Sequence, residues 1–99
     1  MVQDANVGDF ALIEFDTSPK KYYVGRITKP EDGEGDYEIA YMRRKRSTWE
    51  FHFPQVEDIA SGNLNDIKMI LPSPTQCGST SRQKSCFMFA YDFKLLNVN

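Results

Sequence analysis

Residues 37–53 constrain the fold of this chain more than any other stretch. Aromatic and branched side chains occupy every second position of two short runs there: Tyr37, Ile39 and Tyr41, then Trp49, Phe51 and Phe53. Strict alternation places each set on one face of a β-strand. A loop of four consecutive basic residues, Arg43, Arg44, Lys45 and Arg46, separates the two runs. The pattern predicts two strands joined by a basic loop.

Other short runs predict further strands. They cover residues 10–15, 21–29, 66–71 and 85–93, and breaks rich in Gly, Pro, Asp and Ser stand between the runs. Residues 56–59 are too few for a full helix, so we expect one helical turn that tucks Val56 and Ile59 inward. Five strands with one helical turn before the last predict an all-β fold, a small SH3-like barrel with an added C-terminal strand. Closing the sheet would remove exposed strand edges.

The chain of 99 residues is long enough for a single core. We expect the barrel at residues 7–71. Residues 72–84 are rich in Ser, Thr, Gln, Gly and Pro and predict a flexible loop. Residues 85–99 include the apolar run 86–93, which is too apolar for a free tail. We expect them to form a C-terminal strand extension packed on the barrel.

Charge and cysteine content narrow the classes of function. A net charge of -2 argues against a protein wholly devoted to nucleic acid, because phosphate binding needs a positive surface. Cys77 and Cys86 are too few for a disulfide scaffold and form no CxxC pair for zinc. His52 is the only histidine, and no catalytic constellation surrounds it. We therefore expect no metal, no cofactor and no enzymatic activity.

Apolar runs of the length of a signal peptide core or a membrane span do not occur in the sequence. We therefore expect an intracellular protein without a membrane partner, and a monomer is favoured. Cys86 lies in an apolar run, which predicts a buried thiol. A bridge between Cys77 and Cys86 is geometrically feasible, but a reducing intracellular setting disfavours it.

Several motifs resemble those of a Tudor domain, an SH3-like barrel of the Royal superfamily. Val7-Gly8-Asp9 and the strand that follows resemble the opening Gly-Asp turn and first strand of that family. Residues 23–27 (Tyr-Val-Gly-Arg-Ile) resemble its second strand, and residues 37–41 resemble its third. Residues 56–59 resemble the helical turn before its last strand. The resemblance covers about residues 7–71, and its motifs are shared with other SH3-like barrels.

Tudor domains that read methylation hold their ligand in a cage of aromatic rings. The resemblance implies that Phe15, Tyr23 and Tyr41 form this cage, with Trp49 as a candidate fourth wall. Aromatic faces attract a methylated ammonium or guanidinium group, by about 0.5–2 kcal/mol each. The implied function is non-catalytic recognition of a protein peptide, with methylated lysine or arginine as the candidate ligand group. The implied setting is chromatin or ribonucleoprotein, and we expect a nuclear location.

Other interpretations compete with this one. Phe15, Tyr23 and Tyr41 could equally belong to the core, since small domains bury many aromatic residues. The cationic loop departs from the Tudor pattern and would repel a cationic ligand. Its four basic residues instead suit nucleic acid or an acidic partner, with aromatic residues stacking on bases. A third hypothesis is a structural or oligomerisation domain whose apolar residues 87–93 pair with another chain.

Overall fold

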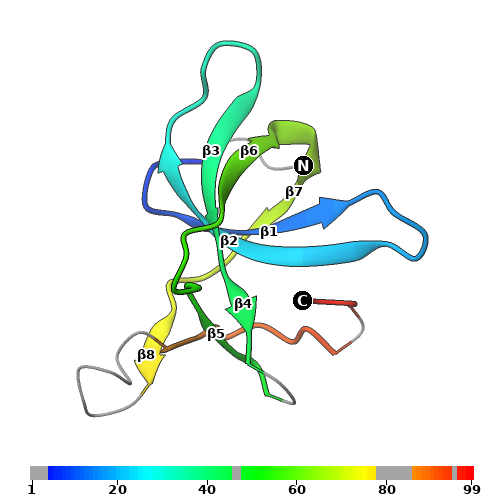
Figure 1. Cartoon of the computed structure of the whole chain (residues 1–99), viewed down its shortest axis with the longest axis vertical. Coiled ribbons are helices and arrows are strands. Elements are labelled where there is room, and N and C mark those ends of the chain that lie inside the picture. Colours follow the sequence, from blue (N-terminus) through cyan, green and yellow to red (C-terminus); the bar gives the residue numbers. More distant parts are fainter. Residues whose placement is uncertain (1–4, 46–47, 78–85, 95) are drawn as a thin grey trace.

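The computed structural model describes residues 5–45, 48–77, 86–94 and 96–99, which form a small all-β domain (Figure 1). The strands make two antiparallel sheets, one of five strands and one of four. The prediction of an all-β fold is confirmed. The division into two sheets differs from the single barrel that the sequence predicted.

The five-stranded sheet has the strand order β6-β3-β2-β1-β7. Its strands are β1 (Phe10–Phe15), β2 (Lys21–Lys29), β3 (Asp36–Tyr41), β6 (Ile59–Asn63) and β7 (Ile67–Ile70). The predicted bounds of β1 and β2 are confirmed. Ala11, Leu12 and Ile13 are all buried although they point to alternating faces. Both faces of β1 are therefore covered, which explains why its sequence is almost continuously apolar.

The four-stranded sheet has the strand order β4-β5-β9-β8 and lies beyond one end of the larger sheet (Figure 1). Its strands are β4 (Arg43–Arg44), β5 (Glu50–His52), β8 (Thr75–Cys77) and β9 (Cys86–Met88). β5 pairs with β9, so the middle of the chain and its C-terminal part meet in this sheet. The C-terminal strand joins this second sheet and is no addition to a barrel.

The hairpin predicted within residues 37–53 is wrong in its pairing. β3 pairs with β2 and β6, whereas β5 pairs with the two-residue strand β4. The chain changes sheets at Met42, which is fully buried and donates its backbone N–H to the carbonyl of Val24 at 2.8 Å. The alternation identified both strands, but it carried no information about which neighbour each would pair with.

Two apolar clusters hold the domain together. The first joins the two sheets: Leu12, Tyr22, Val24, Met42, Phe51, Leu71, Phe89, Phe93 and Val98. The second lies on the opposite face of the five-stranded sheet: Ala11, Ile13, Ile27, Tyr37, Ile39, Tyr41 and Ile67. Burying a large apolar side chain contributes about 1.5–3 kcal/mol. The β2 strand shows the division directly, because Val24 belongs to the first cluster and Ile27 to the second.

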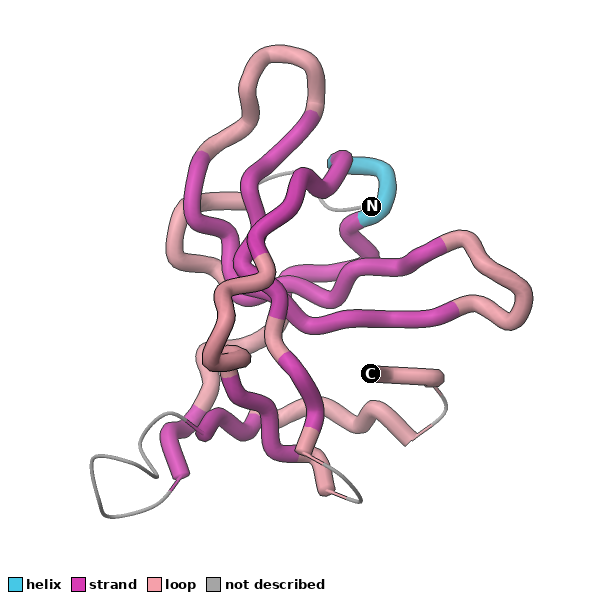
Figure 2. The backbone as a smooth tube through the Cα atoms, in the orientation of Figure 1, coloured by secondary structure: helices cyan, strands magenta, loops and turns pink. Residues whose placement is uncertain are grey.

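The five-stranded sheet is not closed into a barrel. Its edge strands β6 and β7 are joined by a 3-10 helix, Leu64–Asp66, and do not pair with each other within the described residues (Figure 2). Asn63 caps this helix by accepting a hydrogen bond from the backbone N–H of Asn65 at 2.9 Å. The cap and the single helical turn bring the chain from one edge of the sheet to the other.

The helical turn predicted at residues 56–59 is wrong. Ile59 begins strand β6, and no helix is found at these positions. The expected inward packing is also wrong, because Val56 is 83% exposed and Ile59 is 44% exposed. Pairing with β3 decides the conformation of Ile59, which lies opposite Ala40 in the ladder. Such a contact between distant residues overrides the weak local preference of a short segment.

The C-terminal part of the chain packs on the rest of the domain. Phe89, Phe93 and Val98 are buried in the first cluster. Backbone hydrogen bonds of 2.9 Å tie the end of the chain to β2: Tyr22 N–H to Asn97 O, and Asn99 N–H to Tyr22 O. The loop predicted at residues 72–84 contains strand β8, and its residues 78–84 lie outside the described part.

Candidate functional site

Three of the four predicted ligand-binding aromatics meet at one place. Phe15 ends β1, Tyr23 lies in β2 and Tyr41 ends β3. Their ring centroids are 4.9 Å apart for Phe15–Tyr23, 6.0 Å for Phe15–Tyr41 and 6.2 Å for Tyr23–Tyr41. The rings are tilted or nearly perpendicular, with interplanar angles of 57°, 76° and 83°. The sequence therefore identified residues that form one aromatic cluster.

Two glycines allow the close packing of Ile39, next to Tyr41, against strands β2 and β6. A Cβ atom on Gly25 would collide with Ile39 and would lie 3.5 Å from Cδ1 of Tyr41. A Cβ atom on Gly62 would also collide with Ile39 and would lie 3.4 Å from the Tyr41 hydroxyl. The phenol ring thus extends from β3 toward β6 over backbone that carries no side chain. A larger residue at either position would have to displace the side chain of Ile39.

A hollow of about 330 Å³ opens beside this cluster, between the end of β1 and strand β6. Its lining residues are Ile13, Glu14, Phe15, Asp16, Tyr41, Ser61, Gly62 and Asp66. Phe15 is 39% exposed and Tyr41 only 5%, so the phenylalanine stands at the mouth and the tyrosine forms an inner wall. Two perpendicular ring faces and several carboxyl groups thus surround the same space.

The carboxyl groups of the hollow differ in their partners. Glu14 accepts a hydrogen bond from the Tyr22 hydroxyl at 3.0 Å and lies 3.5 Å from the Lys20 ammonium. Asp16 and Asp66 are exposed and form no ion pair within the described residues. Burial, followed by the charges of Asp58 and Asp66, raises the pKa of Tyr41 to about 12. The tyrosine hydroxyl therefore stays protonated, and Asp66 adds negative charge near the ring.

Ring geometry is compatible with cation binding. A cation interacts with a ring when it lies within about 6 Å of the centroid. Two perpendicular faces can both meet that condition when their own centroids are about 6 Å apart, as those of Phe15 and Tyr41 are. The same separation belongs to edge-to-face packing, which stabilises the rings against each other without a ligand.

Trp49 lies outside this cluster. Its ring stacks on Phe93, with centroids 5.5 Å apart and planes 22° apart, and the guanidinium of Arg44 lies 3.9 Å from its centroid. It packs against the first apolar cluster, whereas Tyr41 belongs to the second. The switch of sheets after Met42 separates them. Trp49 therefore contributes no wall to the hollow.

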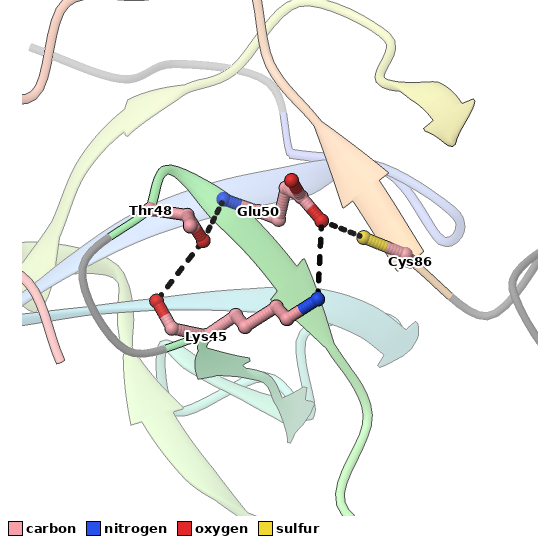
Figure 3. A network of polar contacts seen from close by, with 4 residues as sticks. All are labelled: Lys45, Thr48, Glu50 and Cys86. Atoms are coloured by element: carbon pink, nitrogen blue, oxygen red, sulfur yellow. Dashed lines mark hydrogen bonds and ion pairs between the residues drawn. The ribbon is translucent and has the colours of Figure 1, made fainter. Parts of the chain in front are cut away.

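The described basic residues of the loop are all engaged. Arg43 forms an ion pair with Asp58, and its guanidinium lies 5.9 Å from the centroid of Tyr23. Arg44 donates to the carbonyl of Thr48 at 2.6 Å. The Lys45 ammonium lies 3.9 Å from Oε1 of Glu50 (Figure 3). Arg46 lies outside the described residues. The loop therefore leaves less free positive charge than its sequence suggests.

Arg43 also decides which rings are available. The guanidinium over Tyr23 places one of the chain's own cations at that ring. Asp58 pairs with the Arg43 guanidinium. The positive charge of Arg43 therefore adds little repulsion toward a second cation. Phe15 and Tyr41 are therefore the rings that line the hollow. Tyr23 packs against both of them and is not among the lining residues.

The prediction of a buried thiol at Cys86 is wrong. Cys86 is half-buried and disulfide-bonded, and its backbone is paired across the strands with Cys77. Its sulfur also lies 3.1 Å from Oε1 of Glu50, next to Lys45 (Figure 3). Disulfides are rare in reducing compartments. This bond is therefore at odds with the setting that the sequence led us to expect.

One group of acidic residues in the described ranges is close enough to bind a metal ion. Ligand oxygens of Asp32, Glu34 and Asp36 lie within 4.8 Å of one another in the loop after β2. Oδ1 of Asp32 accepts hydrogen bonds from the backbone N–H groups of Glu34 at 2.8 Å and Asp36 at 3.3 Å. These hydrogen bonds fix the backbone of the loop, which accounts for the closeness of the three carboxylates without a metal ion.

Sequence reasoning missed Asp16, Ser61, Gly62 and Asp66 as lining residues. Asp16 follows Phe15 directly, so its position next to the aromatic residue was a usable signal. The other three lie some 45 residues or more from Phe15 in the chain, and only the pairing of β6 with β3 brings them near.

Comparisons with protein-family models, with curated proteins and with solved structures found no match for this chain. Among the described residues, no helix has the length and apolar character needed to cross a membrane. The case for a function therefore depends on the geometry of the hollow and on the resemblance of the sequence motifs.

Proposed function

We propose that this domain is a non-catalytic binding module that takes a cationic side chain of a protein peptide into the hollow beside Phe15 and Tyr41. Methylated lysine or arginine is the ligand group that fits best. One observation carries the proposal: the nearly perpendicular rings of Phe15 and Tyr41 line the same space as Asp16 and Asp66, whose carboxylates form no ion pair within the described residues. Aromatic faces attract the charge through their quadrupoles, and the carboxylates attract it directly.

Methylation should increase the affinity of a cationic side chain for such a site. A methylated ammonium keeps its charge but loses hydrogen-bond donors, so it enters an apolar enclosure with a smaller loss of hydration. Two ring faces at about 0.5–2 kcal/mol each supply only part of the binding free energy. Contacts with the rest of the peptide must therefore contribute to any useful affinity.

A titration of isotope-labelled protein, followed by NMR, tests the proposal. Peptides that carry trimethyllysine or dimethylarginine should shift the amide signals of Phe15, Tyr41 and Asp66, and an unmodified or acetylated peptide should shift them less. Phe15→Ala should weaken binding by about two- to thirtyfold, the contribution of one ring face. Tyr91→Ala is the matched control, because Tyr91 is 38% exposed and packs on Phe93 instead.

Shifts confined to residues 43–45, or equal affinity for an acidic peptide, would contradict the proposal. The first result would favour nucleic acid or an acidic partner at the basic loop, the alternative function. That alternative draws support from Lys45, whose side chain is 66% exposed. It predicts binding that weakens steeply with salt, because counterions are released from the nucleic acid.

Residues 87–93, expected to pair with another chain in the oligomerisation hypothesis, are used within this one. Phe87 packs against Phe10 at 5.7 Å and Phe53 at 5.8 Å, and Phe89 and Phe93 are buried. The three phenylalanines of this segment thus have partners within the chain, whereas Met88 is 46% and Tyr91 38% exposed.

A further inference from the structure

Among the residues that the structure describes, strand β6 is an unprotected sheet edge. The two sheets end in four edge strands, and β6 with its five residues is the longest of them. Natural proteins protect such edges with charged residues, proline or very short strands. The edge strand β7 contains Lys68, and β4 has only two residues. The β6 sequence Ile-Ala-Ser-Gly-Asn contains no charge and no proline.

Backbone groups of Ile59 and Ser61 face outward along this edge. Hydrogen bonds of 2.8 Å from Tyr41 N–H to Asp58 O and from Leu64 N–H to Gly35 O fix the phase of the ladder with β3. In an antiparallel ladder, alternate residues point their N–H and C=O groups to the neighbour. Asp58, Ala60, Gly62 and Leu64 therefore point these groups toward β3. Ile59 and Ser61 alternate with them, so the N–H and C=O groups of these two residues point away from β3. Neither residue has a hydrogen-bond partner there within the described part of the chain.

Acidic residues surround the edge. Glu57 and Asp58 precede β6, and Asp66 follows it. Asp16 lies across the hollow, which Ser61 and Gly62 also line. A second hollow of about 240 Å³, with Ile59, Glu57 and Asp58 in its lining, lies at the start of the strand.

Few free cations oppose this acidic charge. Lys29 lies 3.7 Å from Oε1 of Glu38, and Arg26 lies over the ring of Phe10 at 5.6 Å. Asp58 is paired with Arg43, and Arg26 also lines the second hollow. Glu57, Asp16 and Asp66 form no ion pair within the described residues, so unpaired negative charge remains near the edge and complements a basic partner.

We infer that a basic peptide in extended conformation adds to the free edge of β6 as a further strand, with backbone hydrogen bonds to Ile59 and Ser61. The inference rests on the proposed function, because the added strand would deliver its cationic side chain to the hollow beside Tyr41. Side chains alternate across a strand, so every second residue of the peptide would point toward that hollow. Main-chain pairing supplies the remaining affinity that two ring faces cannot.

A second copy of this chain is a poorer occupant of the edge. Two β6 strands side by side would bring Glu57, Asp58 and Asp66 of both copies together. Like charges across a strand pair are destabilising. The charge distribution therefore favours a basic peptide over self-association.

Amide hydrogen exchange gives the first test. The probe is a synthetic peptide of about ten residues that alternates lysine with threonine and carries one central trimethyllysine, long enough to span β6 with a margin on each side. On saturation, exchange of the Ile59 and Ser61 amides should slow at least tenfold. The amides of Ala60 and Gly62, which already point toward β3, serve as internal controls.

Two backbone changes give the second test. Ser61→Pro removes an outward N–H without removing a bond to β3 and should weaken peptide binding about three- to tenfold, whereas Ser61→Ala keeps the N–H and should change it less than twofold. A peptide N-methylated at every second amide needs no protein variant. Two such peptides are compared, one methylated at the odd-numbered amides and the other at the even-numbered amides. The peptide whose methylated amides face β6 should lose binding, and the other should keep it.

The outcomes separate this inference from the proposed function. Binding that shifts Phe15 and Tyr41 without slowing exchange at Ile59 and Ser61 overturns strand addition and leaves the cation site standing. Absence of binding to any peptide overturns both. A dimer that protects the same amides without peptide, detected by light scattering, overturns the inference in favour of self-association.

Discussion

Phe93→Ala tests whether the C-terminal segment is part of the folded domain. Phe93 is 1% exposed, and its ring contacts Trp49, Phe51, Phe89 and Tyr91 at centroid distances of 5.5, 5.4, 6.4 and 5.0 Å. Truncating a buried phenylalanine to alanine costs about 3–5 kcal/mol. A domain of this size has a free energy of unfolding of about 5–15 kcal/mol. The variant should therefore lose about a fifth or more of its stability.

Urea unfolding followed by tryptophan fluorescence is the assay. Trp49 is the only tryptophan and stacks on Phe93, so its emission reports on this contact directly. With a denaturant dependence near 2 kcal/mol per M, the midpoint should fall by about 1.5–2.5 M. Tyr91→Ala removes an aromatic residue that is 38% exposed. It should lower the urea midpoint by less than half as much as Phe93→Ala does. A loss below about 1 kcal/mol for Phe93→Ala would refute the packing of this segment on the domain.

Three further predictions follow from the polar contacts. Asp66→Asn should lower the pKa of Tyr41 from about 12, because it removes a negative charge that disfavours the tyrosinate; NMR titration of the ring carbons measures this. The Tyr22 hydrogen bond lowers the pKa of Glu14 below its usual 4.5, so this contribution to stability is present above that pH and lost as the pH falls below it. Tyr22→Phe should therefore lose less stability than the wild type between about pH 6 and pH 3, measured by urea midpoints. Reducing agent should lower the free energy of unfolding by about 2–4 kcal/mol in the wild type, and should leave Cys86→Ser unchanged.

Each of these predictions has a result that contradicts it. An unchanged Tyr41 titration in Asp66→Asn would place the carboxylate too far from the ring to favour a cation there. Equal pH dependence in Tyr22→Phe and the wild type would show that the hydrogen bond to Glu14 does not persist in solution. A wild type insensitive to reducing agent would show that the disulfide is absent or contributes no stability.

Local sequence patterns predicted several of the strands but missed β4, β6 and β8. Residues 10–15 and 21–29 form strands with the predicted bounds, because their apolar and turn-forming residues mark both ends. The pattern failed at Val56 and Ile59, where an apolar pair three residues apart suggested a helical turn. Pairing with β3 placed Ile59 in a strand instead.

The aromatic cluster was predictable in part. Phe15, Tyr23 and Tyr41 come from neighbouring strands, and the antiparallel order of β1, β2 and β3 follows from short turns. Trp49 was misplaced because the chain leaves that sheet after Met42. The partners of Arg43 and Arg44 were equally hidden, since Asp58 and Trp49 reach them only in the folded chain.

The sequence alone determined that this chain is an all-β domain with aromatic residues at three strand positions and a basic loop after the third strand. Alternation and turn residues act over a few positions, so they are readable without the fold. Only the tertiary structure decided that there are two sheets, that Arg43 and Lys45 are paired with carboxylates, and that Asp66 and Ser61 stand beside Tyr41. These facts depend on contacts between residues far apart in the chain, which form because apolar faces from distant segments share two cores.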